Sequence, residues 1–86
     1  MNLIFAPQAW ADYLYWQTAD PRILRRVNEL IRDASRSPFE GIGKSEALRH
    51  ALQGFWSRRI SEEHRMVYRV TQQGLEIAQL RYHYES

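Results

Sequence analysis

The chain has 86 residues, of which 44% are hydrophobic and 26% are charged, and its formal net charge is +2. This length predicts one small domain over residues 1–86, and the absence of cysteine excludes disulfides and thiolate metal or redox sites. We expect a cytoplasmic protein without membrane contact, because no apolar stretch is long enough to cross a bilayer and the N-terminus lacks the pattern of a secretory signal.

The basic residues are concentrated in two segments and are almost all arginine. Residues 22–36 carry five arginines against two carboxylates, residues 58–69 carry four against two, and Lys44 is the single lysine. The guanidinium group pairs bidentately with phosphate and sheds water more easily than an ammonium group. This bias favours an anionic partner, although charge alone does not decide between nucleic acid and other acidic surfaces.

The first half of the chain predicts one strand and two helices. Residues 2–6 are short and apolar, as in a strand, and residues 8–18 place large side chains at helical spacing. Asp20 followed by Pro21 is typical of a helix start, since Asp caps free N–H groups and Pro suits the first helical position. The following apolar stripe, with arginines opposite, predicts an amphipathic helix of about four turns ending before Pro38.

The second half predicts a loop followed by strands. Residues 37–47 contain two glycines and a proline, which indicates a loop. Beyond it the hydrophobic period changes to two, predicting strands at Arg49–Leu52, Phe55–Ile60, Arg65–Thr71 and Leu75–His83. Because their connections are short, they can only join antiparallel neighbours. We therefore expect an α+β fold, with an N-terminal strand and two helices packed on one face of an antiparallel β-sheet meander.

Alternation assigns the side chains of the third of these strands to two faces. One face receives Met66, Tyr68 and Val70, and the other receives Arg65, Val67 and Arg69. Burying an arginine is costly, so we expect the helices to cover the first face and water to reach the second. If the last strand stays regular to its end, Arg81 and His83 project together. An open face with arginine and histidine is a plausible catalytic or phosphate-binding surface.

The residue inventory favours acid–base chemistry without a cofactor or metal. The three histidines, His50, His64 and His83, lie in unrelated elements without metal-binding spacing. There is also no phosphate-binding loop, nucleophile elbow or dinucleotide motif. An acid, a base and a phosphate-sized cation remain, and RNA cleavage by its own 2′-OH needs these parts and no metal. Glutamate, histidine and arginine can fill the three roles.

Four segments resemble a known family. They are PFEGIGK at 38–44, WSRRI at 56–60, EHRMVY at 63–68 and RYHY at 81–84. In order and spacing they are similar to the Txe/YoeB toxins of the RelE superfamily. The resemblance implies a RelE-like, microbial ribonuclease-like fold and a toxin of a bacterial type II toxin–antitoxin system. It also implies ribosome-dependent endonucleolytic cleavage of mRNA in the A site, inhibited by a cognate YefM/Phd-type antitoxin.

The resemblance assigns roles to individual residues. It implies that Glu46 is the general base, His83 the general acid and Arg65 the arginine that stabilises the transition state, while Tyr84 shapes the site. The cations expected to face RNA are Lys44, Arg49, Arg58 and Arg59. This chain departs from many relatives in having Ser45 for proline, Arg49 for lysine, and Glu85 and Ser86 after the terminal tyrosine. We expect Ser45 and Arg49 to leave the chemistry intact, and the extra carboxylates after Tyr84 to bear on the charge of the site and so on the rate, not on the reaction.

Other interpretations stay open from the sequence alone. Glu46 could be a loop carboxylate or helix cap, and Arg65 could pair with Glu62 or Glu63 at the surface, which would contribute only about 0–1 kcal/mol. The alternative function is a related-fold toxin that poisons gyrase, or a non-catalytic RNA- or protein-binding module. Family relatives also suggest a homodimer, with DNA contacted only through the antitoxin complex.

Overall fold

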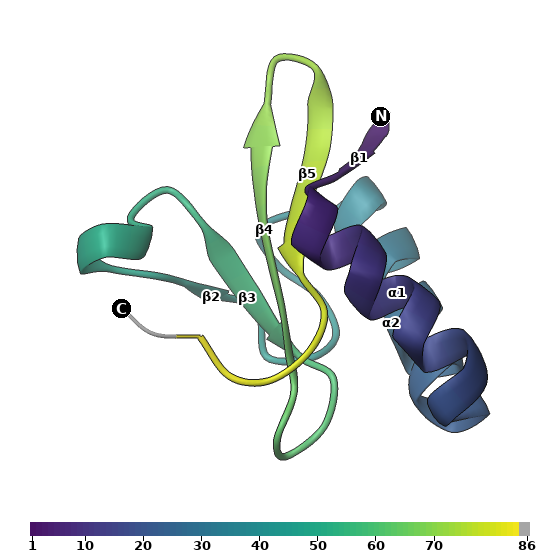
Figure 1. The fold of residues 1–86 in the computed structure, drawn as a ribbon. Helices are drawn as coiled ribbons and strands as arrows, with labels where there is room; N and C mark the ends of the chain where they lie inside the picture. The colour runs from purple at the N-terminus through teal and green to yellow at the C-terminus, as the bar shows by residue number, and fades with distance from the viewer. Residues whose placement is uncertain (85–86) are drawn as a thin grey trace.

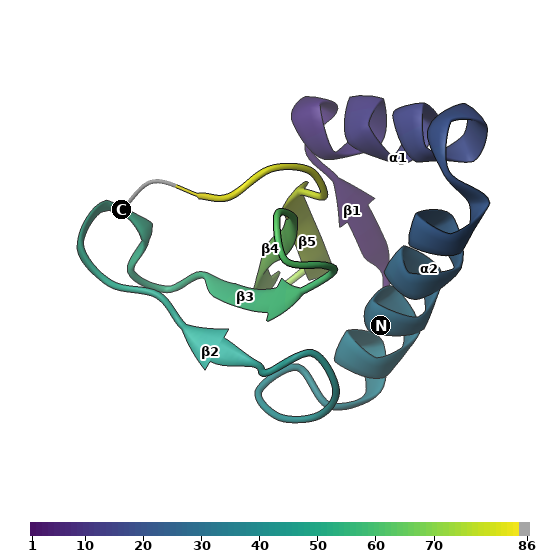
Figure 2. The ribbon, with the colours of Figure 1, turned by 90° about the horizontal axis from the view of Figure 1, so that it is seen from below.

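The computed structural model describes residues 1–84, so Glu85 and Ser86 lie outside the described residues. Two helices pack on one face of a five-stranded sheet, as the α+β prediction requires (Figures 1 and 2). The elements are β1 Leu3–Phe5, α1 Pro7–Ala19, α2 Pro21–Arg36, β2 Glu46–Ala47, the 3₁₀ helix η1 His50–Leu52, β3 Trp56–Arg59, β4 Arg65–Thr71 and β5 Gly74–Gln79. No helix among residues 1–84 has the length and apolar character needed to span a bilayer.

The expected antiparallel meander is confirmed for β2 to β5, and β1, whose orientation was not predicted, makes the sheet mixed. Its order is β1-β5-β4-β3-β2, and β1 lies parallel to β5, with Leu3 opposite Leu75. Strands β2 to β5 are antiparallel to their neighbours, as their short connections demand. The connection argument does not apply to β1, because the helices and three other strands separate it from β5 in the chain.

Two predicted strands differ from the structure. The segment at 49–52 forms η1 because His50 adopts a positive φ of 57° and the amide of Leu52 bonds the Arg49 carbonyl, while β2 lies earlier, at Glu46–Ala47. Strand β5 ends at Gln79 and does not continue to His83. The expected projection of Arg81 and His83 from one regular strand is therefore wrong.

Helix α1 redirects the chain after β5. The Leu80 N–H donates to the buried Asp12 carboxylate at 2.9 Å, and the Trp16 indole N–H donates to the Leu80 carbonyl at 2.8 Å. These bonds replace ladder pairing, and Tyr82 then adopts a positive φ of 64°. Residues 81–84, which we call the tail, consequently leave the sheet and run toward η1 (Figure 2).

The core lies between the helices and the sheet, as predicted. Asp20 caps α2 by accepting from the amides of Arg22 and Ile23. The buried stripe of α2 consists of Val27, Leu30, Ile31 and Ala34, and it packs with Met66, Tyr68, Leu75 and Ile77 of the sheet. Each fully buried aliphatic side chain contributes roughly 1.5–3 kcal/mol, so this stripe holds the helix layer against one face of the sheet.

The other face is partly covered. Val67, predicted to face water, is only 2% exposed, whereas Val70, predicted to lie under the helices, is 39% exposed. The tail runs back beside β4, where the Arg65 N–H donates to the Tyr82 carbonyl at 3.0 Å. At the far end of β4, Val70 is one of the large apolar side chains left accessible to water.

Candidate active site

Strand register brings three predicted site residues to the face opposite the helices. Glu46 in β2 is opposite Ser57 in β3, and Arg59 in β3 is opposite Arg65 in β4. Ser57 and Arg59 are two residues apart and therefore project to the same side. The sheet alone thus places a carboxylate and two guanidinium groups together on the face away from the helices.

The tail adds the imidazole. A pocket of about 250 Å³ is lined by Lys44, Glu46, Ser57, Arg59, Arg65, His83 and Tyr84. Its walls come from the loop before β2, from β2, β3 and β4, and from the tail. Residues distant in the sequence, such as Glu46 and His83, consequently share one cavity.

Ser57 is the pocket residue that sequence reasoning missed. It is only 3% exposed and lines the cavity between Glu46 and Val67. The signal was present in the alternation, because a residue two positions from Arg59 in a strand must share its face. A hydroxyl at this place is able to donate or accept a hydrogen bond.

Arg49 lies beside this pocket, outside its wall. A second hollow of about 340 Å³ is lined by residues 46–50 together with Tyr84. Glu46 and Tyr84 line both cavities, so the two are adjacent. Arg49 is therefore placed to contact a ligand that extends from the pocket along β2.

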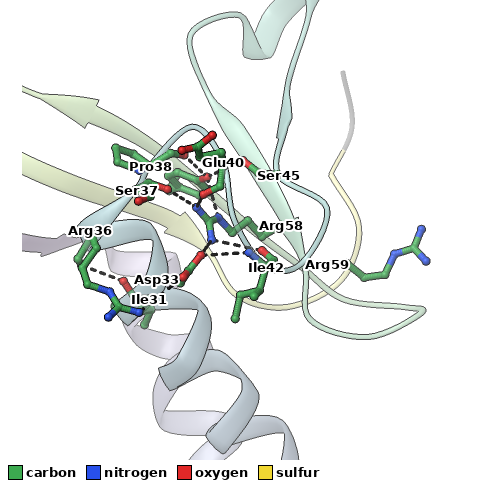
Figure 3. A network of polar contacts seen from close by, with 12 residues as sticks. Ile31, Asp33, Arg36, Ser37, Pro38, Glu40, Ile42, Ser45, Arg58 and Arg59 are labelled. Carbon is green, nitrogen blue, oxygen red and sulfur yellow. Dashed lines mark hydrogen bonds and ion pairs between the residues drawn. The ribbon is translucent and has the colours of Figure 1, made fainter.

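Arg58 corrects one expectation, because its guanidinium is fully buried and does not face a ligand. In β3 it is opposite Met66 on the helix-covered face, whereas Arg59 points away from it (Figure 3). The Arg58 guanidinium pairs with Asp33 and donates to oxygens of Ser37, Glu40, Ile42 and Tyr68. Arg58 thus fastens the loop before β2 to α2 and takes no part in the pocket.

The same network fixes the charge of Asp33. The hydrogen bond from Arg58, followed by one from the Ile42 amide, lowers the pKa of the Asp33 carboxyl from its usual value, against an opposing effect of burial. Arg36, 3.7 Å away, acts in the same direction as Arg58. The loop that carries Lys44 and leads to Glu46 is therefore anchored from behind by an ion pair.

Arg65 is held by carbonyl groups and keeps its charge available. Its Nη1 donates to the backbone oxygens of Ser61, Glu62 and His64 at 2.6–3.1 Å. Within residues 1–84 no ion pair involves Arg65, so the surface pairing with Glu62 or Glu63 is not formed. The carbonyls orient the guanidinium without neutralising it.

The charge balance of the pocket suits an anion. Among residues 1–84, Lys44, Arg59 and Arg65 supply three cations to the pocket against one carboxylate, that of Glu46. The described part of the chain holds no cluster of three or more His, Asp or Glu side chains that could bind a metal ion. A separate hollow of about 710 Å³ between β1, α1 and α2 is mainly apolar, and none of the predicted site residues lines it.

Comparison with known proteins places this geometry in a family. The model of the YoeB-like toxins of bacterial type II toxin–antitoxin systems matches residues 5–84. Toxin YoeB of Escherichia coli (strain K12) is 61% identical over 98% of this chain and 100% of its own length. A YoeB/ParE toxin structure from Agrobacterium tumefaciens is 49% identical, with a TM-score of 0.94 over 98% of this chain and 100% of that chain.

A YoeB–YefM complex from Staphylococcus aureus contains a chain of the same fold. It is 44% identical to this one, with a TM-score of 0.89 over 98% of each chain. The family match, the high identities and the mixed α+β architecture agree with one another. The chain belongs to the YoeB-like toxins of bacterial type II toxin–antitoxin systems.

Proposed function

We propose that this toxin is a ribosome-dependent endoribonuclease that cleaves mRNA in the A site by metal-free general acid–base catalysis and so inhibits translation. One observation carries the proposal: a carboxylate, an imidazole and a guanidinium line one pocket of about 250 Å³. The three groups, on Glu46, His83 and Arg65, are the parts that cleavage by a neighbouring 2′-OH requires.

The proposed step balances without a cofactor. The Glu46 carboxylate removes the 2′-OH proton, and the resulting oxygen forms a bond to the adjacent phosphorus. The bond from phosphorus to the 5′ oxygen breaks, and protonated His83 donates its proton to that oxygen. The products are a 2′,3′-cyclic phosphate and a 5′-hydroxyl. Arg65 neutralises the charge that builds on the equatorial phosphate oxygens.

The remaining residues of the site bind and align RNA. Lys44 and Arg59 line the pocket and can contact the phosphates flanking the scissile bond. Arg49 lines the adjacent hollow and can contact the RNA where it leaves the pocket. Tyr84 lies between the two cavities and shapes both. The ribosome supplies the alignment of the mRNA, which explains how so few catalytic groups suffice.

We propose a YefM/Phd-type antitoxin as the protein partner and a homodimer as the free form. The support comes from relatives: one S. aureus structure is a YoeB–YefM complex, and another, 45% identical to this chain, is a YoeB dimer. An acidic antitoxin segment would suit a pocket with three cations. Contact with DNA would then arise through the antitoxin.

Mapping mRNA ends in a translating bacterial extract tests the function. The purified toxin should produce breaks within A-site codons, with cyclic or 3′-phosphate ends. Glu46→Gln and His83→Gln should each slow cleavage roughly 10²- to 10⁴-fold, the usual contribution of one acid–base group. Glu62→Gln, a change at an exposed carboxylate outside the pocket, is the matched control and should cleave normally.

Two results would contradict the proposal. One is wild-type cleavage by a Glu46→Gln, His83→Gln double variant, which would remove the pocket from the reaction. The other is translation arrest with intact mRNA, or DNA damage without mRNA breaks, which would favour the binding or gyrase-directed alternatives.

A further inference from the structure

Both backbone polar groups of Tyr82 in the tail are held by two consecutive residues at the start of β4. The Tyr82 N–H donates to Nδ1 of the His64 imidazole at 2.7 Å. The Tyr82 carbonyl accepts from the Arg65 N–H at 3.0 Å. These bonds fix a residue whose φ is 64°, a backbone conformation that a tyrosine rarely adopts.

The imidazole takes a place that a backbone carbonyl would otherwise fill. The His64 carbonyl already accepts from the amides of Ile60 and Ser61 and from Nη1 of Arg65. The side chain therefore supplies the acceptor for the tail amide. An imidazole nitrogen accepts only when it carries no proton, so His64 is neutral here with its proton on Nε2.

Packing against α1 holds the imidazole in this orientation. The Trp16 ring meets it edge to face, with centroids 4.8 Å apart and planes at 78°. The Tyr82 ring packs against the imidazole at a tilt of 48°, with ring centroids 5.9 Å apart. Trp16 is itself fixed by its hydrogen bond to the carbonyl of Leu80, the residue that follows β5. Helix, strand and tail thus set the direction in which Nδ1 points.

The residues that directly follow His64 and Tyr82 in the chain carry two of the groups of the proposed reaction. Arg65 directly follows His64 in the chain, and His83 directly follows Tyr82. A displacement of the Tyr82 amide therefore moves the His83 imidazole relative to the Arg65 guanidinium. Misplacement of a reacting group by about 1 Å can cost about 10²-fold in rate.

We infer that His64 is a positioning residue, which holds the tail so that His83 and Arg65 face the same phosphate. The inference rests on the proposed function and deepens it. The His64 side chain is not among the described groups that line the pocket. It acts through the Tyr82 amide, so what matters is the acceptor atom and not the imidazole as a base.

Two substitutions separate this role from plain packing. His64→Asn removes the ring but keeps an acceptor, because Asn Oδ1 lies the same number of bonds from the backbone as His Nδ1. His64→Phe keeps a ring against Trp16 but has no acceptor. A packing role predicts that Phe is tolerated and Asn is not, and the positioning role predicts the reverse.

The experiment measures hydrogen exchange at the Tyr82 amide and the single-turnover cleavage rate of ribosome-bound mRNA. We expect wild type and His64→Asn to protect this amide and to cleave within a few-fold of each other. His64→Phe should lose the protection, keep protection at the buried β4 amides, and cleave roughly ten- to a hundredfold more slowly.

The opposite pattern would overturn the inference, with Phe active and protected and Asn defective. Wild-type cleavage by His64→Phe with an unprotected Tyr82 amide would also overturn it. If the Phe variant does not fold, loss of protection or activity in the Asn variant alone refutes the role. If wild type does not cleave mRNA, the proposed function fails, whereas exchange at Tyr82 still decides whether His64 holds the tail.

Discussion

Replacing Arg58 with methionine should destabilise the toxin severely, because its guanidinium is fully buried and every donor nitrogen is used. Besides pairing with the Asp33 carboxylate, the guanidinium donates hydrogen bonds to the Tyr68 hydroxyl and to the carbonyls of Ser37, Glu40 and Ile42. A hydrogen bond to a charged group contributes roughly 1.5–3 kcal/mol. These losses are not additive, since the loop can relax and water can reach its carbonyls.

We therefore expect Arg58→Met to reduce the free energy of unfolding by at least about 3 kcal/mol, which is equivalent to two such hydrogen bonds. In a domain of this size, each 1 kcal/mol lowers the melting temperature by about 4–8 °C. The melting temperature should accordingly fall by about 12–24 °C or more. The loop that carries Lys44 and leads to Glu46 should also lose its anchor on α2.

Calorimetry and denaturant unfolding of the purified variant test this expectation. The matched control is Arg69→Met in β4, whose side chain is 45% exposed and pairs with Glu76. Such a pair contributes at most about 1 kcal/mol. Equal stability losses in the two variants, or an Arg58→Met protein as stable as wild type, would refute the assignment of Arg58 to the structural network.

Three further predictions concern stability. The lowered pKa of Asp33 means that its carboxylate stabilises the fold above the usual pKa near 3.8 and loses this effect as pH falls through the lowered value. The stability difference between wild type and Asp33→Asn should therefore shrink in acid, and a pH-independent difference in denaturant titrations would contradict this. Asp12→Ala should cost about 1–3 kcal/mol and free the tail, because the buried Leu80 N–H loses its acceptor; unchanged unfolding and cleavage would contradict it. Gly74→Ala should cost roughly 1–3 kcal/mol, because its φ is 147° and a Cβ would lie 2.3 Å from the carbonyl preceding β1. Gly54→Ala, at a positive φ in open space, should cost less in the same melts.

Local signals predicted the helix layer well. The Asp20 cap and the stripe of α2 depend on residues three to four positions apart, so they can be read without knowing the fold. The pairing of β1 with β5 is different, because no short connection constrains it. The predicted strand at 49–52 is wrong because the alternation there spans only four residues. The positive φ of His50 and the hydrogen bonds of the turn determine the conformation instead.

The composition of the site came from the resemblance, and its geometry comes from tertiary contacts. Register explains why Glu46 and Arg65 share a face, and this much follows from strand alternation. The position of His83 does not, because the turn of the tail depends on hydrogen bonds that the Leu80 and Tyr82 amides donate to Asp12 and His64, which are distant in sequence. Arg58 was assigned to RNA because composition cannot show which side of β3 the helices cover. The catalytic roles themselves remain predictions.

The most direct test of the central claim is chemical. A ribosome-bound mRNA with a single 2′-deoxy nucleotide on the 5′ side of the scissile phosphate removes the proposed nucleophile and leaves the phosphates that bind the cations. The proposed reaction predicts that the wild-type toxin leaves this site uncut while cleaving the all-ribose mRNA in a parallel reaction. Cleavage of the deoxy-substituted site at the normal rate would show that the 2′-OH does not attack, and the assignment of Glu46 as its base would be wrong.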